Sequence, residues 1–337
     1  MAQLLGLLLL SFFITAVLLV PFIDFLFKLH LNRTNEAKRR DTLDKAVSVT
    51  KKLLAYKKDR PIGAGALIVV ITASLSLWSY GLLGIHANPS ELFILLFAML
   101  AFALLGLYDD LRKNFNKDRT GFFGLRWRHK LAIQTILGLF IGAYFWWVLG
   151  YNFVNIHWFG LLNMGVLFIP LTAFVVVSFA NAYNVTDGLD GLSTGVLLIC
   201  LVSFAILASQ LLHPSLALFL AVWIGSIIAF MYFNVFPARV ELGDTGALAF
   251  GATLAVVGLL TGKIFALAVI GGIFILEIAS SLIQMLSKHF RGKKVFAVSP
   301  LHLWFMYRGW EEPKVVARFW LAAMLFAIFG LWLGVIK

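Results

Sequence analysis

The sequence predicts an all-α protein that crosses a membrane about ten times. Three observations predict it: 61% of the residues are hydrophobic and the mean hydropathy is +0.93; only 13% are charged, whereas a soluble domain is nearer ~25%; and apolar runs long enough for a spanning helix recur from end to end. These runs are far longer than the ~10 residues of a barrel strand, which leaves helices as the spanning elements. We expect a single integral-membrane domain over residues 1–337.

Each apolar run predicts one span, and the first is read as a span that stays in the protein. The run AQLLGLLLLSFFITAVLLVPFIDFLFKL has no basic segment before it and no small-residue cleavage site, unlike a removable signal peptide. The single cysteine, Cys200, lies inside the sixth span, which excludes an internal disulfide. The expected bounds are about 3–28, 62–86, 91–108, 131–150, 161–180, 192–212, 215–233, 247–262, 264–287 and 317–336.

The basic residues predict the orientation of these spans. Of the 28 Lys and Arg residues, 26 fall in alternate connecting segments: 28–61, 109–130, 234–246 and 288–318. The opposite connections, HANPS, YNFVNIHWFG and LLHPS, contain none. The positive-inside rule then places the basic segments in the cytoplasm and both termini outside. The net charge of +12 is explained by this topology and by attraction to anionic lipids, because the basic residues are too dispersed to indicate a nucleic-acid surface.

Five of the 16 acidic residues are expected at the cytoplasmic ends of the spans. They are Asp109 and Asp110 after the third span, Asp187 and Asp190 after the fifth, and Asp244 before the eighth. One such Asp is commonly a solvated helix end or a cap, but acids near the membrane from three distant segments indicate a site. Clustered carboxylates repel one another unless a cation or a proton separates them. Without a Cys or His cluster nearby, Mg²⁺ is the expected cation.

The stretch NAYNVTDGLDGLSTG, residues 181–195, places a polar side chain at every third position. This spacing keeps neighbouring side chains on one side of a helix end. Gly188 and Gly191 would let the backbone approach a ligand closely, although an Asx-rich turn is the simpler alternative. The polar residues of this stretch are Asn181, Asn184, Asp187 and Asp190.

Basic side chains near the same membrane face add the means to bind phosphate oxygens. Carboxylates, Mg²⁺ and cations at a lipid–water boundary are what phosphoryl transfer requires. The candidate phosphate-binding residues are Lys57, Lys58, Arg126, Arg128 and Lys130.

At these motifs the chain resembles the polyprenyl-phosphate N-acetylhexosamine-1-phosphate transferase superfamily. The matching segments are YDDLRK, RHKLAIQ, NAYNVTDGLDGL, FNVFPARVELGDTGALAFG and SPLHLWFMYRGWEEPKVVARFW, in order over nearly the whole chain. The segment GWEEPKVVARFW is similar to the muramoyl branch of that superfamily. The resemblance implies ten spans with both ends outside, in agreement with the orientation argued above.

The resemblance also implies roles for individual residues. Asp244 matches a Mg²⁺ ligand, with Asp187 as a second candidate ligand. Glu277 matches a further family position, which we interpret as a buried structural acid. The implied catalytic residues are Asp109, Asp110, Asp187, Lys130 and His302. The implied substrate-binding residues are Asn181, Asn184, Asp190, Lys57 and Lys58.

The implied reaction transfers phospho-N-acetylmuramoyl-pentapeptide from its UDP-activated form to undecaprenyl phosphate, giving lipid I and UMP, with Mg²⁺ as cofactor. We expect a bacterial cytoplasmic-membrane enzyme with its active site on the cytoplasmic face, and a homodimer as its assembly. Two segments depart from the family: a motif of three His reads His302, Leu303, Trp304, and TPTMGG is replaced by RPIGAG at 60–65. These departures keep open a transferase of N-acetylglucosamine-1-phosphate and an inactive scaffold. A membrane transporter is the alternative from another class.

Overall fold

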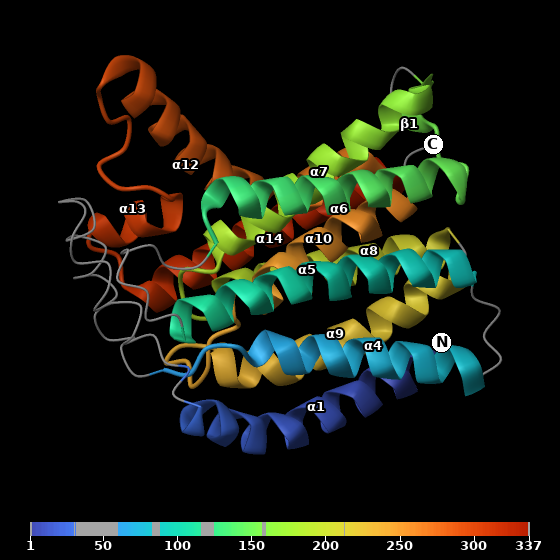
Figure 1. Ribbon diagram of the computed structural model, residues 1–337, viewed down its shortest axis with the longest axis horizontal. Coiled ribbons are helices and arrows are strands. Elements are labelled where there is room, and N and C mark those ends of the chain that lie inside the picture. Colours follow the sequence, from blue (N-terminus) through green and yellow to red (C-terminus); the bar gives the residue numbers. More distant parts are fainter. Residues whose placement is uncertain are drawn as a thin grey trace.

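The computed structural model describes residues 2–29, 31, 60–82, 88–115, 125–156, 160–211 and 213–335. Within these residues, ten helices are long and apolar enough to cross a membrane, which confirms the predicted all-α membrane fold. Successive long helices run back and forth between the two ends of the bundle, and both termini lie at the same end (Figure 1). That this end faces outward stays a prediction.

Within the described residues, the elements are helices apart from one small hairpin. Strands β1 (Phe153–Ile156) and β2 (Gly160–Asn163) pair antiparallel, and the short 3-10 helix η2 (Gly165–Leu167) follows. The α-helices are α1 (Ala2–Lys28), α4 (Ala64–Leu82), α5 (Pro89–Phe115), α6 (Trp127–Trp147), α7 (Phe168–Thr186), α8 (Leu192–Gln210), α9 (Pro214–Asn234), α10 (Gly243–Leu260), α11 (Ile264–Ile270), α12 (Gly272–Arg291), α13 (Leu301–Tyr307) and α14 (Glu312–Val335).

Helix α10 forms the centre of the bundle, because it packs against α5, α7 and α4 and is buried almost throughout. Glycines make these close approaches possible, as is common where helices pack in membranes. A Cβ on Gly65 or Gly246 would collide with the facing helix, and a Cβ on Gly251 would meet the carbonyl of Phe179. The start of α10 is therefore held firmly between three neighbours.

Several predicted span limits differ from the observed helices. Helix α5 continues to Phe115, so Asp109 and Asp110 lie on the helix instead of after it. Helix α10 begins at Gly243, which places Asp244 in its first turn, and α14 begins five residues before the predicted 317. The predicted span from 161 instead begins with strand β2, because residues 160–163 pair with β1.

The predicted ninth span, 264–287, is interrupted at Gly271. Helix α11 ends at Ile270 and α12 begins at Gly272, and paired glycines are a common cause of such breaks. A side chain at 271 would also press on the ring of Phe179. After the break, α12 leans away from the bundle and projects at one end (Figure 1).

Helix α12 carries its polar residues on the inner face and its apolar residues outside. Gln284 accepts hydrogen bonds from the N–H groups of Val295 and Phe296 and donates to the Phe296 carbonyl, while Ser287 donates to the Lys293 carbonyl. Leu282, Ile283, Met285, Leu286 and Phe290 are exposed. The inner stripe therefore holds the segment that leads into α13.

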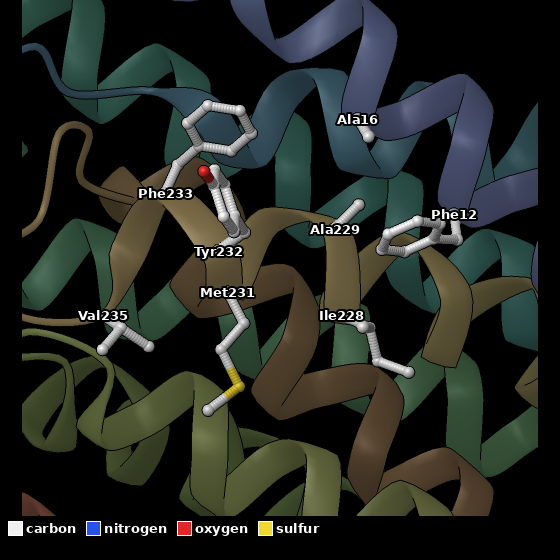
Figure 2. A pocket seen from close by; sticks show the side chains of 8 residues that line it. All are labelled: Phe12, Ala16, Ile228, Ala229, Met231, Tyr232, Phe233 and Val235. Atoms are coloured by element: carbon white, nitrogen blue, oxygen red, sulfur yellow. The ribbon is translucent and has the colours of Figure 1, made fainter.

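A groove of ≈ 470 Å³ lies between α1 and α9. Figure 2 shows Phe12 and Ala16 from α1 opposite side chains from the last two turns of α9, which include Ile228 and Met231. The lining is apolar except for the hydroxyl of Tyr232. The groove therefore offers no set of charged groups and is separate in character from the polar site described next.

Candidate active site

Two lysines and two aspartates from three helices form one ion-pair cluster, which we call the Asp–Lys cluster: Asp109, Lys113, Lys130 and Asp244. Lys130 Nζ donates to Asp244 Oδ2 at 2.6 Å and to Asp109 Oδ2 at 3.0 Å. Lys113 Nζ lies 2.8 Å from Asp244 Oδ2 and 3.3 Å from Asp109 Oδ2. The Asp109 side chain is only 3% exposed, whereas the other three are 17–18% exposed. The cluster therefore balances two negative charges with two positive ones and opens on the side of the lysines and Asp244.

Asp110 fixes the first turn of α10 next to this cluster. Its carboxylate accepts hydrogen bonds from the backbone N–H groups of Asp244 and Thr245 and from the Thr245 hydroxyl, at 2.7–3.1 Å. A helix start has unpaired N–H groups, and a carboxylate there also interacts favourably with the helix dipole. The carboxylate of Asp110 therefore acts as a cap supplied by α5, which sets the position of Asp244.

Glycine at two positions allows α5 and α10 to meet this closely. A Cβ on Gly106 would collide with the Asp244 carbonyl. Gly243 has φ of +81°, a conformation that L side chains rarely adopt, and a Cβ there would lie 2.9 Å from Asp110 Oδ2. The GDTG sequence therefore places an acid at the helix start because the preceding glycine permits the turn.

The polar residues of the 181–195 stretch take different directions instead of forming one row. Asn181 donates to Gln134 Oε1 on α6 and to the Val177 carbonyl, so its amide holds two helices together. The Asn184 side chain is partly exposed and makes no hydrogen bond to the described residues. Asp187 ends α7 and accepts a hydrogen bond from the Ser193 hydroxyl on α8. Asn181, Asn184 and Asp187 are partly exposed, whereas Asp190 is buried.

Asp190 is the centre of a second, separate network. Arg60 Nη1 lies 2.7 Å and 2.6 Å from its two carboxylate oxygens, and the Ala238 N–H also donates to it. The N–H of Asp190 donates to Glu312 Oε1 at 2.6 Å. Four segments from distant parts of the chain are joined at this buried residue. Such an arrangement restricts the Asp190 carboxylate to a fixed structural position.

The segment that differs from the family pattern, 60–65, pairs with the segment before α10. Ile62 and Glu241 form a parallel bridge, and the Glu241 carbonyl accepts hydrogen bonds from the N–H groups of Gly63 and Ala64. The Leu242 carbonyl accepts from the N–H of Gly65. Because these contacts use backbone groups, the altered sequence still forms an ordered wall beside the Asp–Lys cluster.

His302 is buried between α12 and the turn after α7. Its Nδ1 lies 2.8 Å from Glu277 Oε2, and its backbone N–H donates to Glu277 Oε1 at 3.1 Å. Glu277 thereby caps α13, whose own N-cap residue is Pro300, without a side-chain donor or acceptor. A Cβ on Gly188 would collide with His302 Nε2. The ring is therefore fixed by Glu277 on one side and faces the Asp187–Gly188 turn on the other.

The other predicted basic residues are Lys57, Lys58, Arg126 and Arg128, and none of them belongs to the Asp–Lys cluster. Lys57 and Lys58 lie outside the described residues. Arg126 is the N-cap residue of α6, and the guanidinium of Arg128 lies 5.5 Å from the centroid of the Trp127 ring. Neither fact assigns them a ligand.

Sequence reasoning did not single out Lys113, Arg60, Thr245 or Glu312. Lys113 could have been found from its i+4 spacing to Asp109 if the helix had been predicted to continue past 108. Thr245 follows directly in the GDTG motif. Arg60 and Glu312 had no such signal, because their partner Asp190 is 130 and 122 residues away along the chain.

The residues of the site fit a Mg²⁺ ion that takes most of its ligands from a substrate. They do not fit a metal ion that is coordinated by protein side chains alone. In the part of the chain that the structure describes, no three His, Cys, Asp or Glu side chains come together as a possible metal site. Mg²⁺ commonly uses one or two carboxylates together with phosphate oxygens and water. The partly exposed Asp244 carboxylate is a donor of the right kind, and its position beside two ammonium groups also suits the approach of phosphate.

The sequence of this chain is similar to a known family and to several of its members. Residues 92–262 match the model for glycosyl transferase family 4. A phospho-N-acetylmuramoyl-pentapeptide-transferase of Anoxybacillus flavithermus is 33% identical over 97% of this chain and 96% of its own length. Proteins of the same name from Shouchella clausii and Bacillus velezensis are 36% and 35% identical, each over 83% of this chain and 85% of their own length.

Proposed function

This chain belongs to glycosyl transferase family 4 and to its phospho-N-acetylmuramoyl-pentapeptide-transferases, and we propose how its Asp–Lys cluster serves the transfer. The reaction moves phospho-N-acetylmuramoyl-pentapeptide from its UDP-activated form to undecaprenyl phosphate, giving lipid I and UMP. The observation that carries this conclusion is the 33% identity over 97% of the chain. The N-acetylglucosamine-1-phosphate alternative is not favoured, because relatives over most of the chain bear the muramoyl name.

The chemistry requires one P–O bond to form and one to break. An oxygen of the lipid phosphate attacks the donor phosphorus that bears the sugar, and the bridging P–O bond to the uridine-side phosphate breaks, so that UMP leaves with the bonding electrons. The second pKa of a phosphate monoester is ~6, so the nucleophile is already an anion at neutral pH. The protein therefore has to screen two approaching anions and align them, rather than supply a strong base.

In this proposal Lys130 screens the charge of the reacting phosphates. Its ammonium has three N–H donors, and two of them point at Asp109 and Asp244. The third can reach a phosphate oxygen without breaking the cluster. Lys113, on the other side of Asp244, adds a second positive charge at the same place. The two aspartates hold these ammonium groups in position until substrate arrives.

The two neighbouring acids of α5 take different roles in this proposal. Asp109 Oδ1 accepts a hydrogen bond from the Leu125 N–H, and Oδ2 contacts Lys113 and Lys130. Oδ2 can therefore release one lysine and accept a proton or a hydrogen bond from a phosphate hydroxyl of the acceptor. Asp110 is engaged by three donors of the first turn of α10. We assign it a positioning role, because a nucleophile or base needs an accessible lone pair. Direct attack by the lipid phosphate is accordingly preferred over a phospho-aspartate intermediate.

We propose that Asp244, with Asp187 as second ligand, would hold Mg²⁺. The bound ion would neutralise part of the pyrophosphate charge in the donor. Support for the metal comes from the carboxylate chemistry of Asp244, and the start of α10 would favour the anionic pyrophosphate that shares the ion.

The residues around the 181–195 stretch are proposed to serve the donor. Asn184 and Asp187 have accessible polar groups for sugar or phosphate contacts. Asn181 and Asp190 support the site through Gln134 and Arg60. His302 contributes through Nε2, which faces the Gly188 turn. Lys57 and Lys58 are also proposed to contact the donor. This proposal rests only on their place in the sequence, just before residues 60–65.

The proposed membrane arrangement places the Asp–Lys cluster on the cytoplasmic side. The cluster lies at the end of the bundle where α5 ends and α10 begins, opposite the termini (Figure 1). The connections at that end carry most of the Lys and Arg residues, which favours a cytoplasmic location. A soluble UDP donor would then reach the lipid phosphate there. The oligomeric state, including a homodimer, stays a prediction.

A donor comparison tests the function. Purified protein with undecaprenyl phosphate and Mg²⁺ is supplied with UDP-N-acetylmuramoyl-pentapeptide or with UDP-N-acetylglucosamine, and UMP release is measured. We expect UMP only with the first donor and only in the presence of both lipid and Mg²⁺. Release with the second donor alone would contradict the proposal. Release of one equivalent of UMP without lipid would instead favour the covalent route.

A further inference from the structure

The end of α13 and the first two turns of α14 carry a group of cations stacked on indole rings. The Arg318 guanidinium carbon lies 4.2 Å from the centroid of the Trp310 ring, and Lys314 Nζ lies 5.4 Å from the same centroid. The Arg308 guanidinium carbon lies 4.9 Å from the centroid of the Trp304 ring. We refer to Trp304, Arg308, Trp310, Lys314 and Arg318 as the cation–aromatic cluster. Its two arginines and its lysine are exposed.

These cations have unused capacity to bind an anion. Among the described residues, no carboxylate lies within ion-pair distance of Arg308, Lys314 or Arg318. Of the two nearby acids, Glu312 is buried and accepts from the Asp190 N–H, and Glu311 is exposed. A guanidinium that stacks on an aromatic face keeps its N–H edge available for phosphate oxygens. The cluster thus combines three positive charges with rigid planar supports.

The same face of α14 continues into the bilayer as an apolar stripe. From Arg318 the helix places Leu321, Leu325 and Ile328 at successive intervals of three and four residues, and residues at this spacing share one face. These three side chains are 60%, 70% and 65% exposed. Lys314 precedes Arg318 by four residues on that face. A positively charged head region and an apolar tail region therefore follow one another along a single helix face.

We propose that this face is a binding site for an anionic phospholipid, with the phosphate in the cation–aromatic cluster and the acyl chains along the apolar stripe. The stripe favours a lipid over free phosphate, because a soluble anion would gain nothing from it. The site lies on α13 and α14, and none of its residues belongs to the Asp–Lys cluster. The proposed phospholipid is therefore bound outside the Asp–Lys cluster.

Binding of phosphatidylglycerol to the detergent-purified protein tests the proposal, with native mass spectrometry counting retained lipid across a titration. Phosphatidylcholine and glycerophosphate are the comparison probes. We expect phosphatidylglycerol to bind clearly better than both. The triple variant R308Q/K314Q/R318Q should weaken its binding by roughly tenfold or more, since each cation near a membrane surface contributes substantially to anionic-lipid affinity.

A matched control removes the same charge from exposed residues at the other end of the α12–α13 connection. The variant K288Q/R291Q/K294Q loses three cations without changing any cation–aromatic pair described above. We expect it to retain most of the binding. If both triple variants lose binding equally, diffuse surface charge explains the affinity and the proposed site is wrong. Equal binding of glycerophosphate would rule out the lipid as the ligand.

A milder variant addresses the case in which the triple variant does not fold, and the molecular mass of the complex reveals a change in oligomeric state. If the triple variant does not fold, R318K keeps the charge but loses the planar stack, and we expect it to weaken binding several-fold with an unchanged melting temperature. No effect of R318K would contradict the stacked geometry. A change from one oligomeric state to another in the variants, without loss of lipid, would assign this face to a second copy of the chain instead.

Discussion

Lys130 on α6 and Asp244 on α10 are 114 residues apart in the sequence, and their Nζ and Oδ2 atoms lie 2.6 Å apart. Lys130 also reaches Asp109, so one ammonium group connects α6 with both α5 and α10. This contact gives the most direct test of the proposed chemistry, because a neutral residue of similar size would keep the packing but remove the charge.

The substitution Lys130→Gln should lower turnover by ~10²-fold or more, on the scale of losing a major electrostatic group at a reacting centre. The measurement is UMP release at saturating donor, with the melting temperature as a check on folding. Lys288→Gln, which removes an exposed cation on α12 outside the Asp–Lys cluster, is the matched control and should lose far less. Equal losses in the two variants would contradict a specific role for Lys130.

The substitution Asp244→Asn should give a folded protein with activity reduced by ~10²-fold or more. Its amide cannot balance the two lysines or bind Mg²⁺ well. A Mg²⁺ titration of UMP release checks the assignment, and added Mg²⁺ should not restore the rate. Near-normal turnover at saturating Mg²⁺ would refute Asp244 as the metal ligand.

The substitution Glu277→Ala should destabilise the protein by roughly 2–5 kcal/mol, because two buried hydrogen bonds lose their partner at ~1–3 kcal/mol each. It leaves the His302 N–H and Nδ1 without their acceptor. Thermal unfolding in detergent measures the loss. Glu277→Gln keeps one acceptor oxygen, so it should lose less stability than Glu277→Ala. An unchanged melting temperature in the alanine variant would disprove the capping role.

The substitution Gly106→Ala should force α5 and α10 apart and disrupt the Asp–Lys cluster, because the added methyl collides with the Asp244 carbonyl backbone. Overpacking of this kind costs roughly 1–3 kcal/mol or more. Gly81→Ala is the control, since a Cβ there meets no atom within 4 Å. We expect activity and melting temperature to fall only for Gly106→Ala; a fall in both variants would point to a general effect of helix glycines.

Arg60 and Asp190 should show coupled effects on stability. A double-mutant cycle with Arg60→Gln and Asp190→Asn should give an interaction free energy of about 1–3 kcal/mol, as for residues in one hydrogen-bonded network. Unfolding of the four proteins under identical conditions provides the measurement. Additive effects would mean that the contact of Arg60 with the Asp190 carboxylate does not stabilise the protein.

The spans were predictable because each depends on a local run of apolar residues, and the shared site of Asp109 and Asp244 followed from their position at equivalent span ends. The break at Gly271 was missed because hydropathy continues unchanged across it, although the adjacent glycines 271 and 272 were a local signal for it. The role of Arg60 could not be predicted, since its partner lies far along the chain and ion pairing has no periodic signature.

The 181–195 stretch illustrates the same limit within one motif. Its three-residue spacing was interpreted as one polar row, but the helix ends at Thr186 and the chain then turns at a left-handed Gly191. Asn181 therefore faces α6, while Asp190 faces Arg60. Periodicity predicts direction only as far as the helix continues.

The hydrogen bond from Asp190 to Glu312 has a consequence for biosynthesis. A ribosome delivers the chain from its N-terminus, so the turn that contains Asp190 enters the membrane well before residue 312 is translated. The carboxylate that completes this turn arrives with the final helix. Maturation of the catalytic pocket must therefore wait for the last segment to insert, and a nascent chain that stalls before it would be membrane-integrated yet unfinished.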